Sequence, residues 1–221
     1  MKALYRWCYE MRLCELPRNI GRYARMTVPE PEPEVFTLDE VNMLWDAAPS
    51  RLRCFIALAV NCGYGQSDVS NLTVKGINLE DGFIERHRAK TRIRSKHKLW
   101  PVTIGLIEQH MEAGAHGDDR AFLTRNGHPL VHTGWDGNLK KSDAIKSSFW
   151  RLMRKVGIDG GRGFYSLRDT GSTQIERINP LVTEMYLAHT EKGMKRHYAE
   201  RDWDALAVAL DELERYFGLQ V

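Results

Sequence analysis

Three prolines at alternate positions divide this chain near its N-terminus. Pro29, Pro31 and Pro33 alternate with Glu30 and Glu32. Because proline lacks an amide donor and fixes its own backbone, the run can continue neither a helix nor a strand. It predicts an extended, solvated linker between two parts of the chain.

One amphipathic helix is predicted before this linker. Its apolar residues at helical spacing are Leu4, Trp7, Cys8 and Met11. Pro17 ends the pattern. A lone helix cannot build a core of its own, so residues 1–34 are predicted to be a remnant helix plus linker, and residues 35–221 the main domain.

Helices dominate the predicted main domain. Thr37 and Glu40 have the spacing of a capping box, and a mostly apolar helix over about 52–62 should end at Gly63. Ser67 and Asp68 can cap a short helix that follows. Further helices are predicted over about 104–111, 145–156, 166–178, 180–188 and 203–217.

A small sheet is predicted in the middle of the chain. Asp81-Gly82, a dipeptide typical of two-residue hairpins, separates strands over 77–80 and 83–86, and a third strand is expected near 98–102. The predicted fold class is therefore α+β and mainly α-helical, with one three-stranded antiparallel sheet.

Composition excludes several classes of protein. The chain has 221 residues, 43% of them hydrophobic, and 32 Lys+Arg against 29 Asp+Glu give a net charge of +3, which is ordinary for a globular domain. Its four cysteines form no CxxC pair, which argues against a zinc ribbon or a disulfide framework and favours a reducing cytoplasm. No apolar run is long enough for a membrane anchor, and no signal peptide is visible.

Positive charge gathers in the segment from Arg86 to Lys98, which contains no acidic residue. Its candidate DNA-binding residues are Arg86, Arg88, Arg92, Arg94, Lys96 and Lys98. On a sheet edge and its turn, such side chains would meet the phosphates of double-stranded DNA and release counterions. A solvated edge strand, protected from aggregation by its charge, is the alternative.

The C-terminal third carries the more specific pattern. Tyr165-Ser166-Leu167-Arg168 is followed by His189, 21 positions after Arg168, and by Tyr198, nine positions later. This arrangement resembles the tyrosine recombinase, or phage integrase, family over about residues 35–217. The resemblance implies the mostly helical catalytic domain of that family, with residues 1–34 as the remnant of its N-terminal core-binding domain.

The resemblance also assigns catalytic roles. It makes Tyr198 the nucleophile that forms a 3′-phosphotyrosine, Arg168 and His189 the groups that stabilise the phosphate, and Lys90 the hairpin lysine. Tyr165 stands where the family has the histidine of its HxxR motif. A guanidinium offers paired donors to a phosphate, and a lysine can protonate the departing 5′ oxygen, so the chemistry needs neither metal nor cofactor.

One departure from the family pattern is more serious than that of Tyr165. Gly65 stands where the family usually carries its first arginine, and losing one such donor typically costs a hundred- to a thousand-fold in rate. Candidates for local compensation are Gln66, Arg86, Arg88, Arg92 and Arg94.

Other functions stay open at this stage. The runner-up is a catalytically impaired DNA-binding accessory protein of the same fold, and an RNA-binding helical domain is more remote. A zinc site is disfavoured, because the scattered histidines lack ligand spacing. The resemblance also implies assembly into tetramers on DNA, for which the apolar seam of the last helix, from Trp203 to Phe217, is a candidate surface.

Overall fold

The computed structural model describes residues 2–15, 34–87, 93–135, 139–158, 160–189 and 201–220. The chain forms two compact units, Met1–Glu32 and Pro33–Val221. In the first unit, helix α1 (Lys2–Glu10) is the helix predicted there, and the side chains of Leu4 and Trp7 are exposed.

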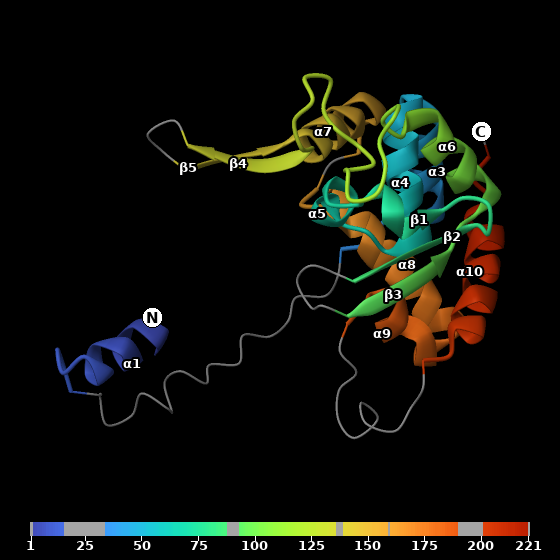
Figure 1. The fold of residues 1–221 in the computed structure, drawn as a ribbon. Coiled ribbons are helices and arrows are strands. Elements are labelled where there is room, and N and C mark those ends of the chain that lie inside the picture. The colour runs from blue at the N-terminus through green and yellow to red at the C-terminus, as the bar shows by residue number, and fades with distance from the viewer. Residues whose placement is uncertain are drawn as a thin grey trace. The chain divides into compact units, whose positions relative to one another are not determined.

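The second unit is built mainly from helices, as predicted (Figure 1). They are α3 (Leu38–Ala47), α4 (Ser50–Cys62), α5 (Gln66–Ser70), α6 (Pro101–His110), α7 (Ala144–Val156), α8 (Phe164–Ile178), α9 (Thr183–Tyr186) and α10 (Trp203–Phe217). Single 3-10 turns cover Val74–Gly76 and Pro180–Val182.

The ends of α3, α4 and α7 follow the predicted capping chemistry, whereas Ser67, predicted to cap α5, lies inside that helix. Thr37 Oγ1 accepts a hydrogen bond from the amide of Glu40 at 3.2 Å, and Glu40 Oε2 accepts one from the amide of Thr37 at 2.9 Å. Helices α4 and α7 end at Gly63 (φ 62°) and Gly157 (φ 74°), in the left-handed region that favours glycine.

The three-stranded antiparallel sheet is also present, in the order β1 (Ile77–Asn78), β2 (Phe83–His87), β3 (Arg94–Lys98). Asn78 pairs with Phe83, so the connection is residues 79–82 and the predicted two-residue turn is wrong. The third strand was expected near 98–102 but ends at Lys98, because Pro101 occupies the first turn of α6, where its missing amide donor costs nothing.

A second, two-stranded sheet was not predicted. Strands β4 (Val131–Trp135) and β5 (Leu139–Asp143) pair antiparallel with each other. Their sequences, VHTGW and LKKSD, lack the alternation of apolar and polar residues that marks a half-buried strand. This hairpin is held by hydrogen bonds between the two backbones. Such pairing needs no hydrophobic pattern, so no sign of it is visible in the sequence.

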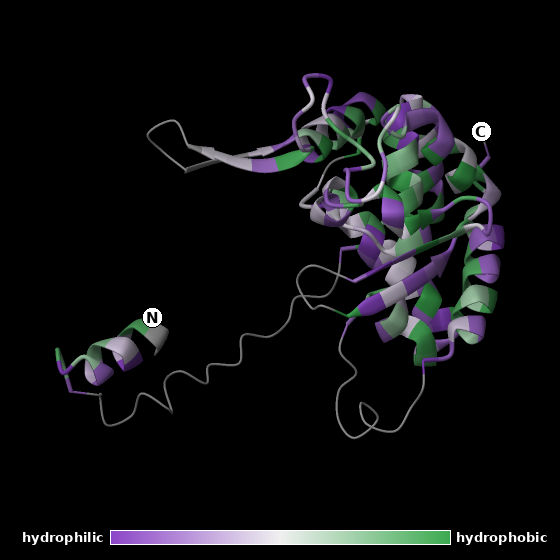
Figure 2. Cartoon of the chain, in the orientation of Figure 1, coloured by the Kyte–Doolittle hydropathy of each residue, from purple (hydrophilic) through white to green (hydrophobic). Residues whose placement is uncertain are grey.

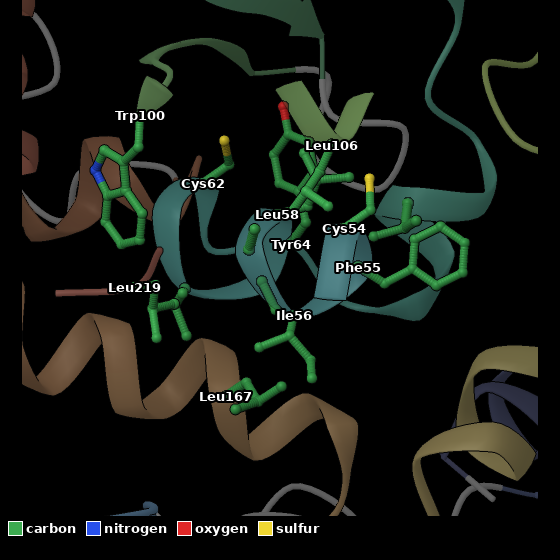
Figure 3. Close-up of a cluster of buried hydrophobic side chains, with 14 of the residues drawn as sticks. Cys54, Phe55, Ile56, Leu58, Cys62, Tyr64, Trp100, Leu106, Leu167 and Leu219 are labelled. Carbon is green, nitrogen blue, oxygen red and sulfur yellow. The ribbon is translucent and has the colours of Figure 1, made fainter. Parts of the chain in front are cut away.

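Helix α4 is the centre of the hydrophobic core, and its residues Ile56–Val60 are all buried. Figure 3 shows it between Leu106 of α6 on one side and Leu167 of α8 on the other. Gly171 lets α8 approach it, because a Cβ there would collide with the hydroxyl of Tyr186 and lie 3.0 Å from the carbonyl of Val60.

The apolar seam of α10 is buried within its own unit. Its buried residues are Leu206, Ala209, Leu210, Leu213 and Phe217. Trp100 Nε1 donates to the carbonyl of Leu210 at 2.9 Å, and Trp45 Nε1 donates to that of Gln220 at 2.8 Å. Hydropathy along the ribbon follows the same division, with apolar faces turned to the core and charged residues along the outer side of α10 (Figure 2).

Among the described residues, no helix combines the length and apolar character needed to cross a membrane.

Candidate functional site

Arg168 lies at the centre of the candidate site. It is on the second turn of α8, and its side chain is only 2% exposed. Its guanidinium donates hydrogen bonds to the carbonyls of Gly63, just after α4, and Leu187, just after α9, the latter at 2.8 Å. A buried arginine needs such partners, and here they fix the guanidinium where three helices meet.

His189 is brought to Arg168 by the short turn after α9. Arg168 Nη2 lies 3.3 Å from Nε2 of His189, and Nδ1 of His189 lies 3.3 Å from Oε2 of Glu184. Because a guanidinium can only donate, Nε2 accepts in this contact, which places the ring proton on Nδ1, toward Glu184. The amide of His189 also donates to the carbonyl of Glu184 at 2.9 Å, so the same residue orients the ring and its backbone.

The turn between α4 and α5 forms the other wall of the site. The carboxylate of Asp68 accepts a hydrogen bond from the amide of Gly65 through Oδ2 at 3.1 Å, and the same oxygen lies 4.0 Å from Nη1 of Arg168. The ring of Tyr165, at the start of α8, lies against Gly65. Gly65 and Tyr165, a hundred positions apart in the sequence, are therefore neighbours in space.

Arg86 reaches the same turn from β2. Its Nη1 donates to the carbonyl of Asp68 at 3.0 Å, and its Nη2 forms an ion pair with Oδ1 of that residue. The guanidinium also lies over the ring of Tyr64, 4.5 Å from its centroid. Asp68 therefore stands between two guanidinium groups, those of Arg86 and Arg168.

A buried histidine lies behind these charges. His97 on β3 packs edge-on between the rings of Tyr64 and Tyr186, and its Nε2 lies 2.9 Å from the carbonyl of Tyr186. Burial, together with the nearby charges of Arg86 and Arg168, lowers the pKa of His97 to about 4. The ring is therefore neutral near pH 7 and adds no charge of its own.

The remaining described basic residues of the segment from Arg86 to Lys98 bind partners elsewhere. Arg94 Nε donates to Glu85 Oε1 at 2.8 Å, and Lys98 Nζ donates to Asp211 Oδ2 of α10 at 2.7 Å. The Nζ atom of Lys96 lies 4.5 Å from the ring centroid of Phe83. The contacts of these three side chains are with Glu85, Asp211 and Phe83, and not with the site around Arg168.

Some predicted site residues lie outside the described residues. They are Arg88, Lys90, Arg92 and Tyr198. The structure thus brings together Gly65, Tyr165, Arg168 and His189, with Arg86 alongside.

Two members of the site had no role in the sequence analysis. Asp68 was predicted to cap a helix and not named as a site residue, yet it contacts Gly65, Arg86 and Arg168. Glu184 orients His189 from five positions upstream, a spacing at which no helix pattern would have paired them. Within the described residues, no group of three or more His, Cys, Asp or Glu side chains could hold a metal ion.

The sequence of residues 34–203 matches the phage integrase family. This chain belongs to that family. No curated protein sequence matches it. The family match spans α3 to the start of α10 and includes every residue of the candidate site.

Solved integrase structures share the fold. The integrase from mycobacterium phage Brujita has a TM-score of 0.60 and 14% identity, with 98% of this chain and 73% of that chain covered. The Tn1549 transposon integrase, in complex with a circular-intermediate DNA, has a TM-score of 0.61 and 16% identity, with 97% and 76% covered. A lambda integrase tetramer bound to a Holliday junction has a TM-score of 0.60 and 17% identity, with 91% and 58% covered.

Proposed function

We propose that this phage integrase family member is a site-specific recombinase that cleaves and rejoins DNA strands through a 3′-phosphotyrosine at Tyr198. The observation that carries the proposal is the meeting of Arg168 and His189. They are 21 positions apart in the sequence, yet the guanidinium lies 3.3 Å from the imidazole, in a chain that belongs to the phage integrase family. The guanidinium supplies the donors that hold a phosphate, and the imidazole lies directly beside it.

The chemistry assigns a task to each residue. Attack on a phosphodiester adds negative charge to the non-bridging oxygens, which the permanent charge of Arg168 stabilises. A phenol with a reference pKa of about 10 is a weak nucleophile near neutral pH, so Tyr198 depends on nearby cations and on His189 to lose its proton. Lys90, as the general acid, donates a proton to the departing 5′ oxygen.

A nicked suicide substrate tests the proposal. Built from the ends of the element that encodes this chain, it traps the covalent intermediate, because the released fragment diffuses away. Wild type should form a denaturant-resistant protein–DNA adduct, and Tyr198→Phe should form none. Tyr9→Phe, which alters an exposed tyrosine on α1, is the matched control and should behave as wild type. An adduct that survives Tyr198→Phe would exclude Tyr198 as the nucleophile.

A second function is supported by Gly65. With no side chain at the position of the first arginine, the site has lost one transition-state donor, so we propose a catalytically impaired DNA-binding accessory protein as the alternative. Both functions predict DNA binding that weakens steeply as salt rises. Only the recombinase predicts a Tyr198-dependent adduct, so salt-sensitive binding without an adduct would favour the accessory protein.

We further propose that double-stranded DNA is the partner, that copies of the chain assemble on it in the cytoplasm, and that α10 contributes to the contact. The apolar seam of α10 is already covered by its own unit, so its outer side, with Val208 and Tyr216, is the part available to a neighbour. Light scattering with and without DNA should show assembly only on DNA, and Val208→Asp should weaken it. Assembly unaffected by Val208→Asp would exclude this side of the helix.

A further inference from the structure

Asp68 places a negative charge beside the arginine that the proposed function requires. Its Oδ2 lies 4.0 Å from Nη1 of Arg168, and both side chains are largely buried, where charges are screened less than in water. Taken alone, this pair would have no net charge. An anion approaching Arg168 would then compete with the carboxylate of Asp68.

Arg86 changes this balance. It contacts the other carboxylate oxygen, Oδ1, and also the backbone carbonyl of Asp68, so both of its terminal nitrogens are committed to that residue. Its side chain is 12% exposed and packs on Tyr64. Within this trio, the two positive charges of Arg86 and Arg168 and the negative charge of Asp68 sum to +1.

The position of Arg86 argues against direct contact with a substrate. Compensation for Gly65 by an arginine that swings to the phosphate needs a mobile side chain, whereas Arg86 is held by two hydrogen bonds and by stacking on a buried ring. If Arg86 left that position, its charge would no longer offset the charge of Asp68 beside Arg168. Arg86 therefore acts through its contacts with Asp68, without moving toward a substrate.

We propose that Arg86 is a positioning residue that neutralises Asp68 and thereby keeps the charge of Arg168 available to a phosphate. This inference rests on the proposed DNA-cleaving function for its purpose, although the charge balance itself can be measured without any reaction. Gly65 gives it weight, because a site with one guanidinium fewer depends more on the charge of the one that remains.

The first test uses the free protein. The ring of His189 lies 3.3 Å from Arg168 and 3.3 Å from Glu184, so its protonation, followed by NMR, reports the local charge. Arg86→Gln removes a positive charge and should raise the midpoint of the His189 titration. Asp68→Asn should lower it, and the double variant should return it close to wild type. A midpoint unmoved by Arg86→Gln would overturn the proposal.

The second test measures adduct formation on the suicide substrate. Arg86→Gln should slow it about tenfold, the equivalent of one pKa unit of lost interaction, and adding Asp68→Asn should restore most of the rate. Arg86→Lys, which keeps the charge, should stay near wild type and also provides a folded variant should Arg86→Gln unfold. A slow Arg86→Gln that Asp68→Asn does not rescue would mean that Arg86 acts on DNA directly, contrary to the proposal.

The two tests separate this inference from the function on which it rests. If wild type forms no adduct while the His189 midpoints move as expected, the recombinase function fails and the charge relationship stands. If wild type forms the adduct and Arg86→Gln forms it equally fast, the function stands and the role of Arg86 is excluded.

Discussion

The ring of Tyr165 lies so close to Gly65 that a Cβ at position 65 would be 3.2 Å from Cδ2 and 3.3 Å from Cε2 of that ring. Such contacts are tighter than side chains normally make. Gly65 has φ −85°, which any residue can adopt, so the restriction on this position is steric and comes from Tyr165.

A double-mutant cycle should detect this contact. Gly65→Ala should destabilise the protein more in wild type than in a Tyr165→Ala background, with a coupling of about 0.5–1 kcal/mol, since Tyr165 is 47% exposed and can partly move away. Urea unfolding measures the four free energies. Gly163→Ala is the control, because it also precedes a helix but a Cβ there meets nothing, and it should show no coupling. Equal coupling at both glycines would contradict the steric explanation.

The same contact predicts how an arginine would be tolerated at position 65. Gly65→Arg alone has to push the Tyr165 ring aside, whereas Gly65→Arg with Tyr165→His also replaces that ring with a smaller one and installs the two residue types that the resemblance implies for these positions. Under the proposed function, the double variant should form the covalent adduct about a hundredfold faster than wild type, the usual effect of one transition-state donor. Gly65→Arg alone should gain less. Equal rates for the two variants would show that Tyr165 does not restrict this position.

The helical part of the fold could be predicted because its signals are local. Capping at Thr37 and the glycines that end α4 and α7 are read from adjacent residues, and the structure confirms them. The β4–β5 hairpin could not, because its stability comes from backbone pairing without an apolar pattern. The length of the turn between β1 and β2 was predicted wrongly for a similar reason. The register of these strands is set by packing and not by the Asp81-Gly82 dipeptide alone.

For the candidate site, motif spacing indicated Arg168 and His189, and the structure places them in contact. The pairing of Arg86 with Asp68 could not be read from the sequence, since it joins residues 18 positions apart on a strand and a short helix. That contact depends on how the sheet packs against α5. From composition alone, Arg86 was one of six DNA-binding candidates. Its side chain is largely buried, which distinguishes it from an arginine that contacts DNA at the surface.

Stability should depend on pH through the capping box of α3. Arg162 donates to both carboxylate oxygens of Glu40, at 2.6 and 2.7 Å, and this bonding, with the amide of Thr37, holds the pKa of Glu40 below its usual value of 4.5. A carboxyl with a lowered folded pKa stabilises the protein above the unfolded pKa, and this contribution is lost as pH falls through the folded value.

Glu40→Gln should therefore be less stable than wild type by about 1 kcal/mol near pH 7, and the difference should shrink as pH falls below about 4.5. Urea unfolding at a series of pH values measures both proteins. Arg162→Gln should remove most of the pH-dependent difference, because the partner charge is gone. A difference that stays constant down to about pH 3 would mean that the ion pair does not contribute.

Arg168 should prove essential for stability as well as for the proposed chemistry. Removing it leaves the carbonyls of Gly63 and Leu187 without its donors, in a region where the side chain is 2% exposed. Arg168→Ala should lower the free energy of unfolding by about 2–4 kcal/mol, because buried carbonyls that lose a charged donor pay the cost of desolvation. Arg177→Ala, at an exposed position on the same helix, should change it by less than about 0.5 kcal/mol.

This difference decides how an inactive Arg168 variant is interpreted. Because Arg168→Ala is expected to unfold more readily, its loss of adduct formation would not by itself identify a phosphate-binding role. Arg168→Lys keeps the charge while losing the paired donors, so a folded but slow Arg168→Lys would separate catalysis from folding. If Arg168→Ala were as stable as Arg177→Ala, the carbonyl contacts would not hold the site together, and its geometry would have to come from α8 packing alone.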